Sequence, residues 1–145
     1  FAPLFREDVH DARLVELDLL PACEAYGVGV IPWSPLGGGL LGGVLGKIEQ
    51  GRRASEHMSK QIEKHRQKLE QWETLCAGLG ENPADVALAW LLTRPAVVAP
   101  IIGPRTSEQL DGCLRALELE LSGETIVALD EIFPGYKPAP EGISW

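Results

Sequence analysis

Hydrophobic and polar positions in the first third of the chain predict a helix, a strand and a loop. Residues 9–26 place apolar side chains on one broad face, which predicts a helix that ends at Gly27 and that Pro21 splits or kinks. Residues 27–33 form a short apolar run with β-branched side chains, bounded by glycine and proline. That run predicts a strand buried on both faces. A glycine-rich loop follows over residues 34–46.

The middle of the chain has longer helical patterns. Residues 54–78 are polar with apolar anchors at helical spacing, which predicts a helix that packs on one side only. The anchors are Met58, Ile62, Leu69, Trp72 and either Leu75 or Cys76. Asn82 and Pro83 then supply a capping residue and a first-turn proline, and residues 84–92 continue as an almost wholly apolar helix. We expect that helix to be buried.

The last third repeats the order of strand and helix. Residues 97–102 predict a second buried strand, after which Thr106 or Ser107 caps a helix. That helix runs to about residue 117 and should face inward through Leu110, Leu114 and Leu117. A final helix is predicted over residues 122–133, followed by a coil tail over residues 134–145.

This alternation predicts an α/β fold in which helices cover parallel strands. Two strands alone make too small a sheet to cover. A parallel (β/α)8 barrel needs about 250 residues and eight strands. If these units belong to such a barrel, the chain carries its smaller, C-terminal portion as one incomplete domain with about two barrel strands.

Composition and charge narrow the class of protein. The chain has 145 residues, 45% of them apolar, and a formal net charge of -8. Such a composition is typical of one soluble domain, and its acidity argues against nucleic acid and anionic membranes as partners. No apolar run approaches the roughly 20 residues that cross a bilayer. We therefore expect a cytoplasmic protein.

The three cysteines and the basic residues complete the chemical inventory. Cys23, Cys76 and Cys113 are widely spaced and have no neighbouring metal-ligand pattern, so we expect no disulfide framework and no zinc site, and thiols that are reduced and mostly buried. Residues 47–68 concentrate the basic side chains. They form either a phosphate-facing strip or a solvated helix, which the Glu56 to Lys60 spacing of four residues favours.

Two phosphate-binding patterns fit the glycine-rich loop poorly. Residues 37–42 match G-x-G-x-x-G formally, but a dinucleotide fingerprint needs a helix opening at the strand's end, and further glycines interrupt one here. A P-loop would need a hydroxyl after Lys47, where the chain has Ile48.

A better candidate for anion binding follows the second predicted strand. Residues 103–109 combine a glycine, Arg105, hydroxyl side chains and the start of a helix. A helix N-terminus offers free N–H groups, and a guanidinium adds a fork of donors for phosphate oxygens. The alternative is a capped helix whose arginine meets Glu108 or solvent.

Four motifs follow one another in a set order. They are Pro32-Trp33-Ser34-Pro35-Leu36 before the glycine-rich loop, Asn82-Pro83 before Val86-Ala87-Leu88-Ala89-Trp90-Leu91, Pro100-Ile101-Ile102-Gly103-Pro104-Arg105-Thr106 before Glu108-Gln109-Leu110, and Ala128-Leu129-Asp130. In order and spacing they resemble the aldo-keto reductase family from about residue 19 to residue 134. The resemblance corresponds only to the C-terminal part of such an enzyme. Residues 1–18 do not show the expected pattern.

The resemblance implies a β/α barrel that binds extended NADP(H) at the C-terminal ends of its strands. By position, the pyrophosphate lies along Ser34, Pro35, Leu36 and Gly39. The adenosine end lies at the loop of Gly103, Arg105, Thr106, Gln109 and Cys113. In that family Arg105 corresponds to the residue that meets the 2'-phosphate and Gln109 to the one that meets adenine.

Two positions depart from the family pattern. An asparagine is usual where this chain has Cys113, and a Gly-Lys pair is usual at about residues 43–44. Here the lysine comes three residues later, at Lys47, which reaches a phosphate only if the loop folds back.

The family's catalytic Asp, Tyr, Lys and His belong to the N-terminal half, so we expect no catalytic residue in this chain. Tyr26-Gly27 imitates the tyrosine motif, but the position of the aspartate is Pro21, and we interpret Tyr26 as a helix-terminal core residue. The prediction is an NADP(H)-dependent carbonyl reductase portion that is inactive alone and acts on a small carbonyl substrate only when its barrel is complete. The alternative is a catalytically silent dinucleotide-binding or interaction module that self-associates or completes a barrel with another chain.

Overall fold

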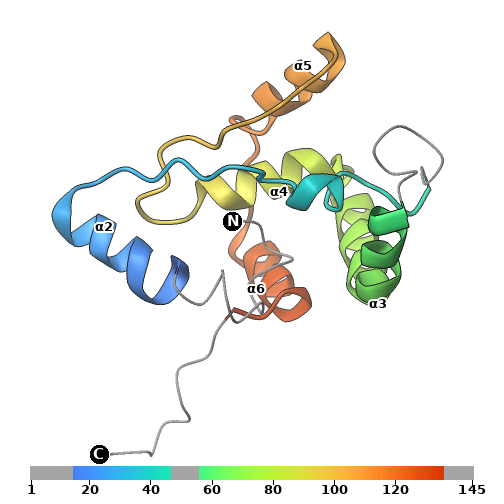
Figure 1. Cartoon of the computed structure of the whole chain (residues 1–145), viewed down its shortest axis with the longest axis horizontal. Helices are drawn as coiled ribbons and strands as arrows, with labels where there is room; N and C mark the ends of the chain where they lie inside the picture. Colours follow the sequence, from blue (N-terminus) through green and yellow to red (C-terminus); the bar gives the residue numbers. More distant parts are fainter. Residues whose placement is uncertain (1–14, 47–55, 136–145) are drawn as a thin grey trace, which may run out of the picture.

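The computed structural model describes residues 15–46 and 56–135. Over these residues a buried helix, α4 (Pro83–Leu92), lies at the centre, and other helices pack around it (Figure 1). The long helix α3 (Glu56–Leu79) and the short helix α5 (Ser107–Arg115) both pack on α4, and α6 (Gly123–Ile132) packs on α3. The predicted helices therefore form, with ends shifted by a few residues.

The N-terminal helix is split as Pro21 predicts. A π-helical turn, η2 (Val15–Leu19), leads into α2 (Leu20–Tyr26), whose first turn contains the proline. Helix α2 ends at Gly27, which has φ 65° and whose N–H donates to the Glu24 carbonyl at 3.2 Å. The predicted start of this helix, residues 9–14, lies outside the described residues.

Helix α4 and its neighbours form the core. Residues 85–91 of α4 are all buried, as its apolar pattern predicts. Against them pack buried side chains from the glycine-rich loop, α3 and α6, namely Leu40, Leu41, Val44, Met58, Ile62, Leu69, Trp72, Cys76, Leu129 and Phe133. The rings of Trp72 and Phe133 meet at 5.8 Å between centroids. The predicted anchors of α3 are thus confirmed, with Cys76 more deeply buried than Leu75.

Caps explain where the helices begin. The Thr106 hydroxyl accepts from the Gln109 N–H at 3.2 Å, and the Ser122 hydroxyl accepts from the Thr125 N–H at 3.1 Å. Asn82 occupies the predicted cap of α4, but its side chain makes no capping bond, and its carbonyl instead accepts the Val86 N–H at 3.1 Å. Side-chain caps therefore specify the starts of α5 and α6, and α4 starts without one.

The two predicted strands are reduced to parallel bridges. Val30 pairs with Val97 and Trp33 pairs with Ile101, and within the described ranges no longer ladder forms. The segments approach closely at Gly29, where a Cβ would lie 2.9 Å from a Val98 methyl carbon. A larger residue at Gly29 would therefore require the Val98 side chain or the backbone to move.

The expectation that these segments are buried on both faces is wrong. Trp33 is 74% exposed and Val98 63% exposed. Val28, Ile31, Ile101 and Ile102 are exposed as well, whereas Val30 and Val97 are half-buried and Pro32 is buried. The physical reason is that burial on two faces needs covering elements on each, and in the described part of the chain the helices cover only one side. The apolar sequence pattern is therefore present, but one side of the two extended segments is exposed to solvent in this structure.

The long helix α3 fits the solvated-helix interpretation of its basic residues. Lys60 Nζ lies 2.7 Å from Glu56 Oε1, and both side chains are largely exposed. Arg66 pairs with Glu63 in the same way, at 2.9 Å. Among the described helices, none is long and apolar enough to cross a membrane.

Candidate functional site

The parallel bridges bring two predicted site segments to one edge. The Ile101 N–H donates to the Pro32 carbonyl at 2.8 Å, next to the bridge between Trp33 and Ile101. Because the two segments run in the same direction, the loops that follow them leave at the same end. The first loop carries Ser34 to Gly39 and the second carries Gly103 to Gln109. These segments lie about 70 residues apart in sequence by their numbering, and the parallel bridges bring them together.

The first loop is a tight turn built on Ser34. Ser34 has φ 52°, an uncommon conformation for a residue other than glycine, and its hydroxyl accepts from the Gly38 N–H at 3.3 Å. Pro35 is buried and Leu36 is half-buried, so both side chains pack against the rest of the protein and hold the loop in place. Gly39 has φ 110°, which a side chain would strain, and its N–H donates to the Leu36 carbonyl at 3.0 Å.

Helix α3 holds the far end of this loop. The Leu45 N–H donates to Glu73 Oε1 at 3.0 Å, and the Trp72 indole N–H donates to the Leu41 carbonyl at 3.4 Å. Leu41 itself is fully buried. The predicted phosphate contact Lys47 lies outside the described residues.

The second loop starts helix α5 in a nearly capping-box arrangement. Thr106 and Gln109 exchange contacts: the hydroxyl of Thr106 accepts the Gln109 N–H, and Gln109 Oε1 accepts the Arg105 N–H at 2.8 Å. Gly103, Arg105 and both capping residues are exposed. The backbone is thus fixed, while the Arg105 guanidinium faces solvent.

Cys113 lies further along α5, against a buried carboxylate of α4. Burial raises the pKa of the Cys113 thiol, and the neighbouring Asp85 charge raises it further. Asp85 is itself 7% exposed, and burial raises its pKa, helped by Glu81 and opposed by Arg115. A Cβ at Gly112 would lie 3.1 Å from Asp85 Oδ1, so the two helices nearly touch there.

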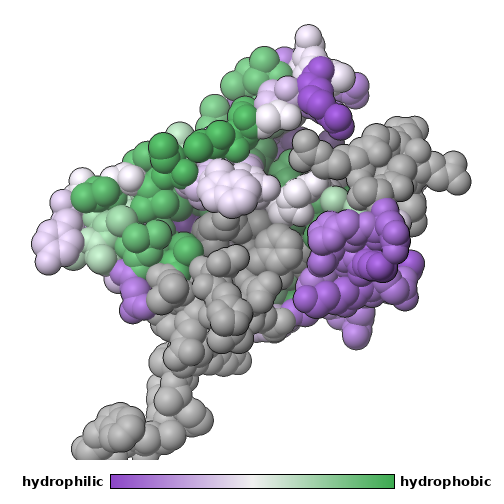
Figure 2. Space-filling view, in the orientation of Figure 1, coloured by the Kyte–Doolittle hydropathy of each residue, from purple (hydrophilic) through white to green (hydrophobic). Residues whose placement is uncertain are grey.

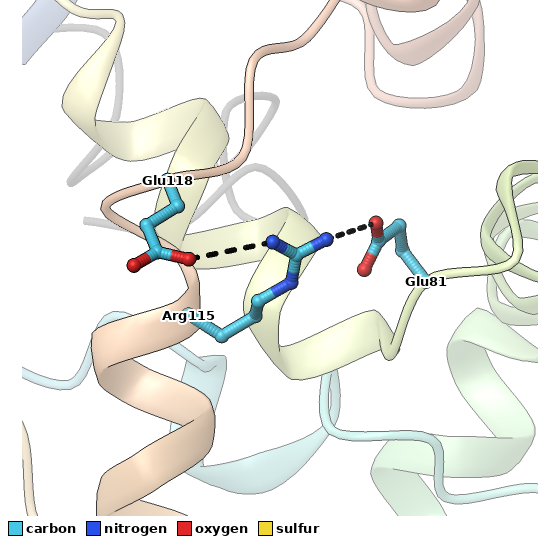
Figure 3. Close-up of polar contacts among 3 residues, drawn as sticks. All are labelled: Glu81, Arg115 and Glu118. Atoms are coloured by element: carbon cyan, nitrogen blue, oxygen red, sulfur yellow. Dashed lines mark hydrogen bonds and ion pairs between the residues drawn. The ribbon is translucent and has the colours of Figure 1, made fainter.

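An arginine bridges the same pair of helices. Figure 3 shows the Arg115 guanidinium between two carboxylates, with Glu81 Oε1 at 3.0 Å and Glu118 Oε2 at 3.5 Å. Glu81 precedes α4, so this contact ties the last turn of α5 to the start of α4. Ion pairs this exposed contribute about 0–1 kcal/mol each. The bridge therefore orients α5 more than it stabilises it.

The apolar side of α5 faces away from this contact, which contradicts the expectation that its leucines face inward. All three are exposed: Leu110 by 43%, Leu114 by 54% and Leu117 by 68%. Figure 2 shows an apolar band that runs from the α2 end of the molecule toward α5. We use the name open apolar face for the exposed large apolar residues of the two extended segments and α5, namely Val28, Ile31, Trp33, Val98, Ile101, Ile102, Leu110, Leu114 and Leu117. Exposed apolar patches of large size are uncommon on soluble monomeric proteins.

The tyrosine that imitates the catalytic motif is exposed to solvent. Tyr26 is the last residue of α2 and is 84% exposed, so its interpretation as a core residue is wrong. The reason is that Leu20, in the first turn, is the one buried residue of α2, so the end of this helix lies outside the packed core. In the described ranges, no group of three or more His, Cys, Asp or Glu side chains is arranged to hold a metal ion.

Sequence reasoning missed two contacts beside the site. Glu73 holds the glycine-rich loop from 28 residues away, and Asp85 faces α5 from inside an apolar helix. A separation of 28 residues leaves no local signal for Glu73. Asp85 does leave one, because it is a lone acid that opens the apolar run of α4.

Comparison with known proteins places these motifs in context. The model of the Aldo/keto reductase family matches residues 5–133. An uncharacterized oxidoreductase, YrpG of Bacillus subtilis, is 48% identical over 134 residues, which are 92% of this chain and 41% of that protein. Norsolorinic acid reductase stcV of Emericella nidulans is 34% identical over 84% of this chain and 31% of its own length.

A plant relative shows the same relation of lengths. A probable aldo-keto reductase 1 of Glycine max is 31% identical over 84% of this chain and 37% of its own length. The chain therefore spans between about a third and two fifths of the relatives named here. Since the family model covers nearly all of it, the chain belongs to the aldo/keto reductase family.

Proposed function

We propose that this chain carries the NADP(H)-binding portion of an aldo/keto reductase barrel. The observation that carries the proposal is the parallel bridge between Trp33 and Ile101, from which the two candidate cofactor loops leave at one edge. Enzymes of this family generally use NADP(H). An extended dinucleotide needs two separate grips, and the loops after the bridge supply one for the pyrophosphate and one for the adenosine end.

The chemistry of the second loop fits the phosphorylated end of the dinucleotide. The exposed Arg105 guanidinium and the first N–H groups of α5 suit a phosphate dianion. Gln109 uses its carbonyl oxygen on the Arg105 N–H, so its amide nitrogen is left to donate to a ring nitrogen of adenine. Cys113, with its raised pKa, stays a neutral thiol and offers a weaker donor than the asparagine usual at that position.

Carbonyl reduction requires groups beyond this chain. Bound NADPH supplies a hydride for the carbonyl carbon, and an acid must protonate the oxygen. Tyr26 is a poor acid for that role because it ends a helix in solvent, away from the two loops' common edge. The residues of this chain bind and orient the dinucleotide; the acid and the small carbonyl substrate's pocket belong to the part of the barrel that the relatives carry in addition.

The test compares cofactor binding with turnover in the purified chain. We expect NADPH to bind, as a change in its fluorescence, while NADPH oxidation with a reactive aldehyde stays at the blank rate. A missing general acid costs roughly a hundredfold to ten-thousandfold in rate. Turnover that disappears in Tyr26→Phe would show that the acid lies in this chain after all. Absence of NADPH binding would contradict the proposed function itself.

The open apolar face favours a second candidate function, an interaction module that completes a barrel with another chain. Its exposed edges and leucines suit further strands and covering segments. For the chain alone we expect self-association in sedimentation velocity. Co-expression with the remaining part of the Bacillus subtilis relative should give a one-to-one complex. Leu114→Lys on this face should weaken that complex, whereas Val127→Lys, at a similarly exposed position on α6, should not.

A further inference from the structure

The glycine-rich loop is fastened at its far end by one side chain of α3. Glu73 Oε1 accepts the Leu45 N–H at 3.0 Å, in a half-buried position. Such a bond to a carboxylate is roughly twice as strong as a bond between neutral groups. The loop therefore has a polar anchor just before Gly46 and Lys47, where a phosphate-facing lysine is expected.

The other contacts of the loop hold a different part of it from the part that Glu73 holds. Leu40, Leu41 and Val44 bury their side chains in the core, and the Trp72 indole N–H meets the Leu41 carbonyl at 3.4 Å. These contacts hold the middle of the loop. The Leu45 side chain also packs partly against the core. Its backbone N–H is held by Glu73.

The Glu73 charge is felt by its neighbours on α3. Burial raises the pKa of Cys76 to about 12, and the Glu73 carboxylate contributes to that rise. A negative charge beside a loop for the pyrophosphate would repel the ligand if it were left pointing outward. Because the carboxylate accepts the Leu45 N–H, it points toward the loop backbone, and the N–H dipole offsets part of its negative charge.

We propose that Glu73 is a positioning residue for the dinucleotide: by accepting the Leu45 N–H, it sets the course of the glycine-rich loop along the pyrophosphate. This inference rests on the proposed function. Because NADPH and NADH share the pyrophosphate, loss of the anchor weakens both cofactors alike. That outcome differs from the loss of Arg105, which affects NADPH alone.

The experiment separates the hydrogen bond from the charge. Glu73→Ala removes both, whereas Glu73→Gln keeps an acceptor oxygen and removes the charge. The control is Glu70→Ala, which deletes an exposed carboxylate one turn earlier on α3. Amide hydrogen exchange at Leu45 is measured by NMR in the full 145-residue chain without cofactor, and both dinucleotides are then titrated by fluorescence.

In Glu73→Ala we expect Leu45 to exchange roughly tenfold to a hundredfold faster, as loss of a charge-assisted bond implies. The Kd values for NADPH and NADH should rise by equal factors of about five to twenty, because only part of the free energy lost with the hydrogen bond is transmitted to cofactor binding. Glu73→Gln keeps a neutral hydrogen bond, so it should recover about half of the lost Leu45 protection and of both affinities on a logarithmic scale. Glu70→Ala should match the wild type.

Three results would overturn the inference. They are unchanged Leu45 exchange in Glu73→Ala, a Glu73→Gln variant as weak as Glu73→Ala, or a loss confined to NADPH. If the wild-type chain binds neither dinucleotide, the proposed function is refuted for this chain. Leu45 exchange still decides, independently, whether Glu73 anchors the loop.

Discussion

Replacing Arg105 with alanine tests how the chain distinguishes NADPH from NADH. The Arg105 backbone is fixed by its N–H bond to Gln109 Oε1 at 2.8 Å, so the substitution leaves the start of α5 in place. Only the exposed guanidinium is lost. A hydrogen bond to a charged group contributes about 1.5–3 kcal/mol, and solvent exposure puts this one near the lower limit. Since 1.4 kcal/mol is tenfold in Kd, we expect a loss of about tenfold to thirtyfold for NADPH.

The assay titrates both cofactors by fluorescence into the wild type, Arg105→Ala and a control. Arg66→Ala is the control because it removes the same charge from α3, where Arg66 pairs with Glu63 three residues earlier on the same helix. The titration is repeated in a chimera in which this chain replaces the matching part of the Bacillus subtilis relative, so that the barrel is complete. NADH affinity should change by less than about twofold. Equal losses for NADPH and NADH would mean that Arg105 supports the fold and does not contact the phosphate.

Three further predictions concern the core. Leu129→Ala should cost about 2–5 kcal/mol of unfolding free energy, because Leu129 is fully buried, whereas Val127→Ala on the exposed side of α6 should cost under about 0.5 kcal/mol in denaturant titrations. The pKa of Asp85 is raised in the folded state, so its ionisation lowers the free energy of unfolding as the pH rises above the ordinary value of 3.8. Asp85→Asn should therefore raise the free energy of unfolding at pH 7, and by less at pH 4. The Cys76 thiol, fully buried and with a pKa of about 12, should resist thiol reagents in the native chain and react only on unfolding, and rapid native labelling would contradict the packed core.

The helices of this protein follow from local sequence. The caps at Thr106 and Ser122, the stop at Gly27 and the interruption by Pro21 act within one turn of the residues concerned. The apolar run of α4 has no polar side to expose, so its burial is also predictable. The family motifs, which the match over residues 5–133 confirms, are likewise present in the sequence alone.

Tertiary structure decided which apolar faces are covered and which distant groups meet. Leu110, Leu114 and Leu117 repeat as a buried stripe does, yet they are exposed, because a periodic pattern records that a face is apolar and not what lies against it. The two extended segments likewise meet only at isolated bridges. Glu73 on Leu45, Arg115 on Glu81 and Asp85 under α5 join residues some 27 to 34 positions apart by their numbering. Contacts at such separations depend on how the helices pack, and no local periodicity or cap encodes them.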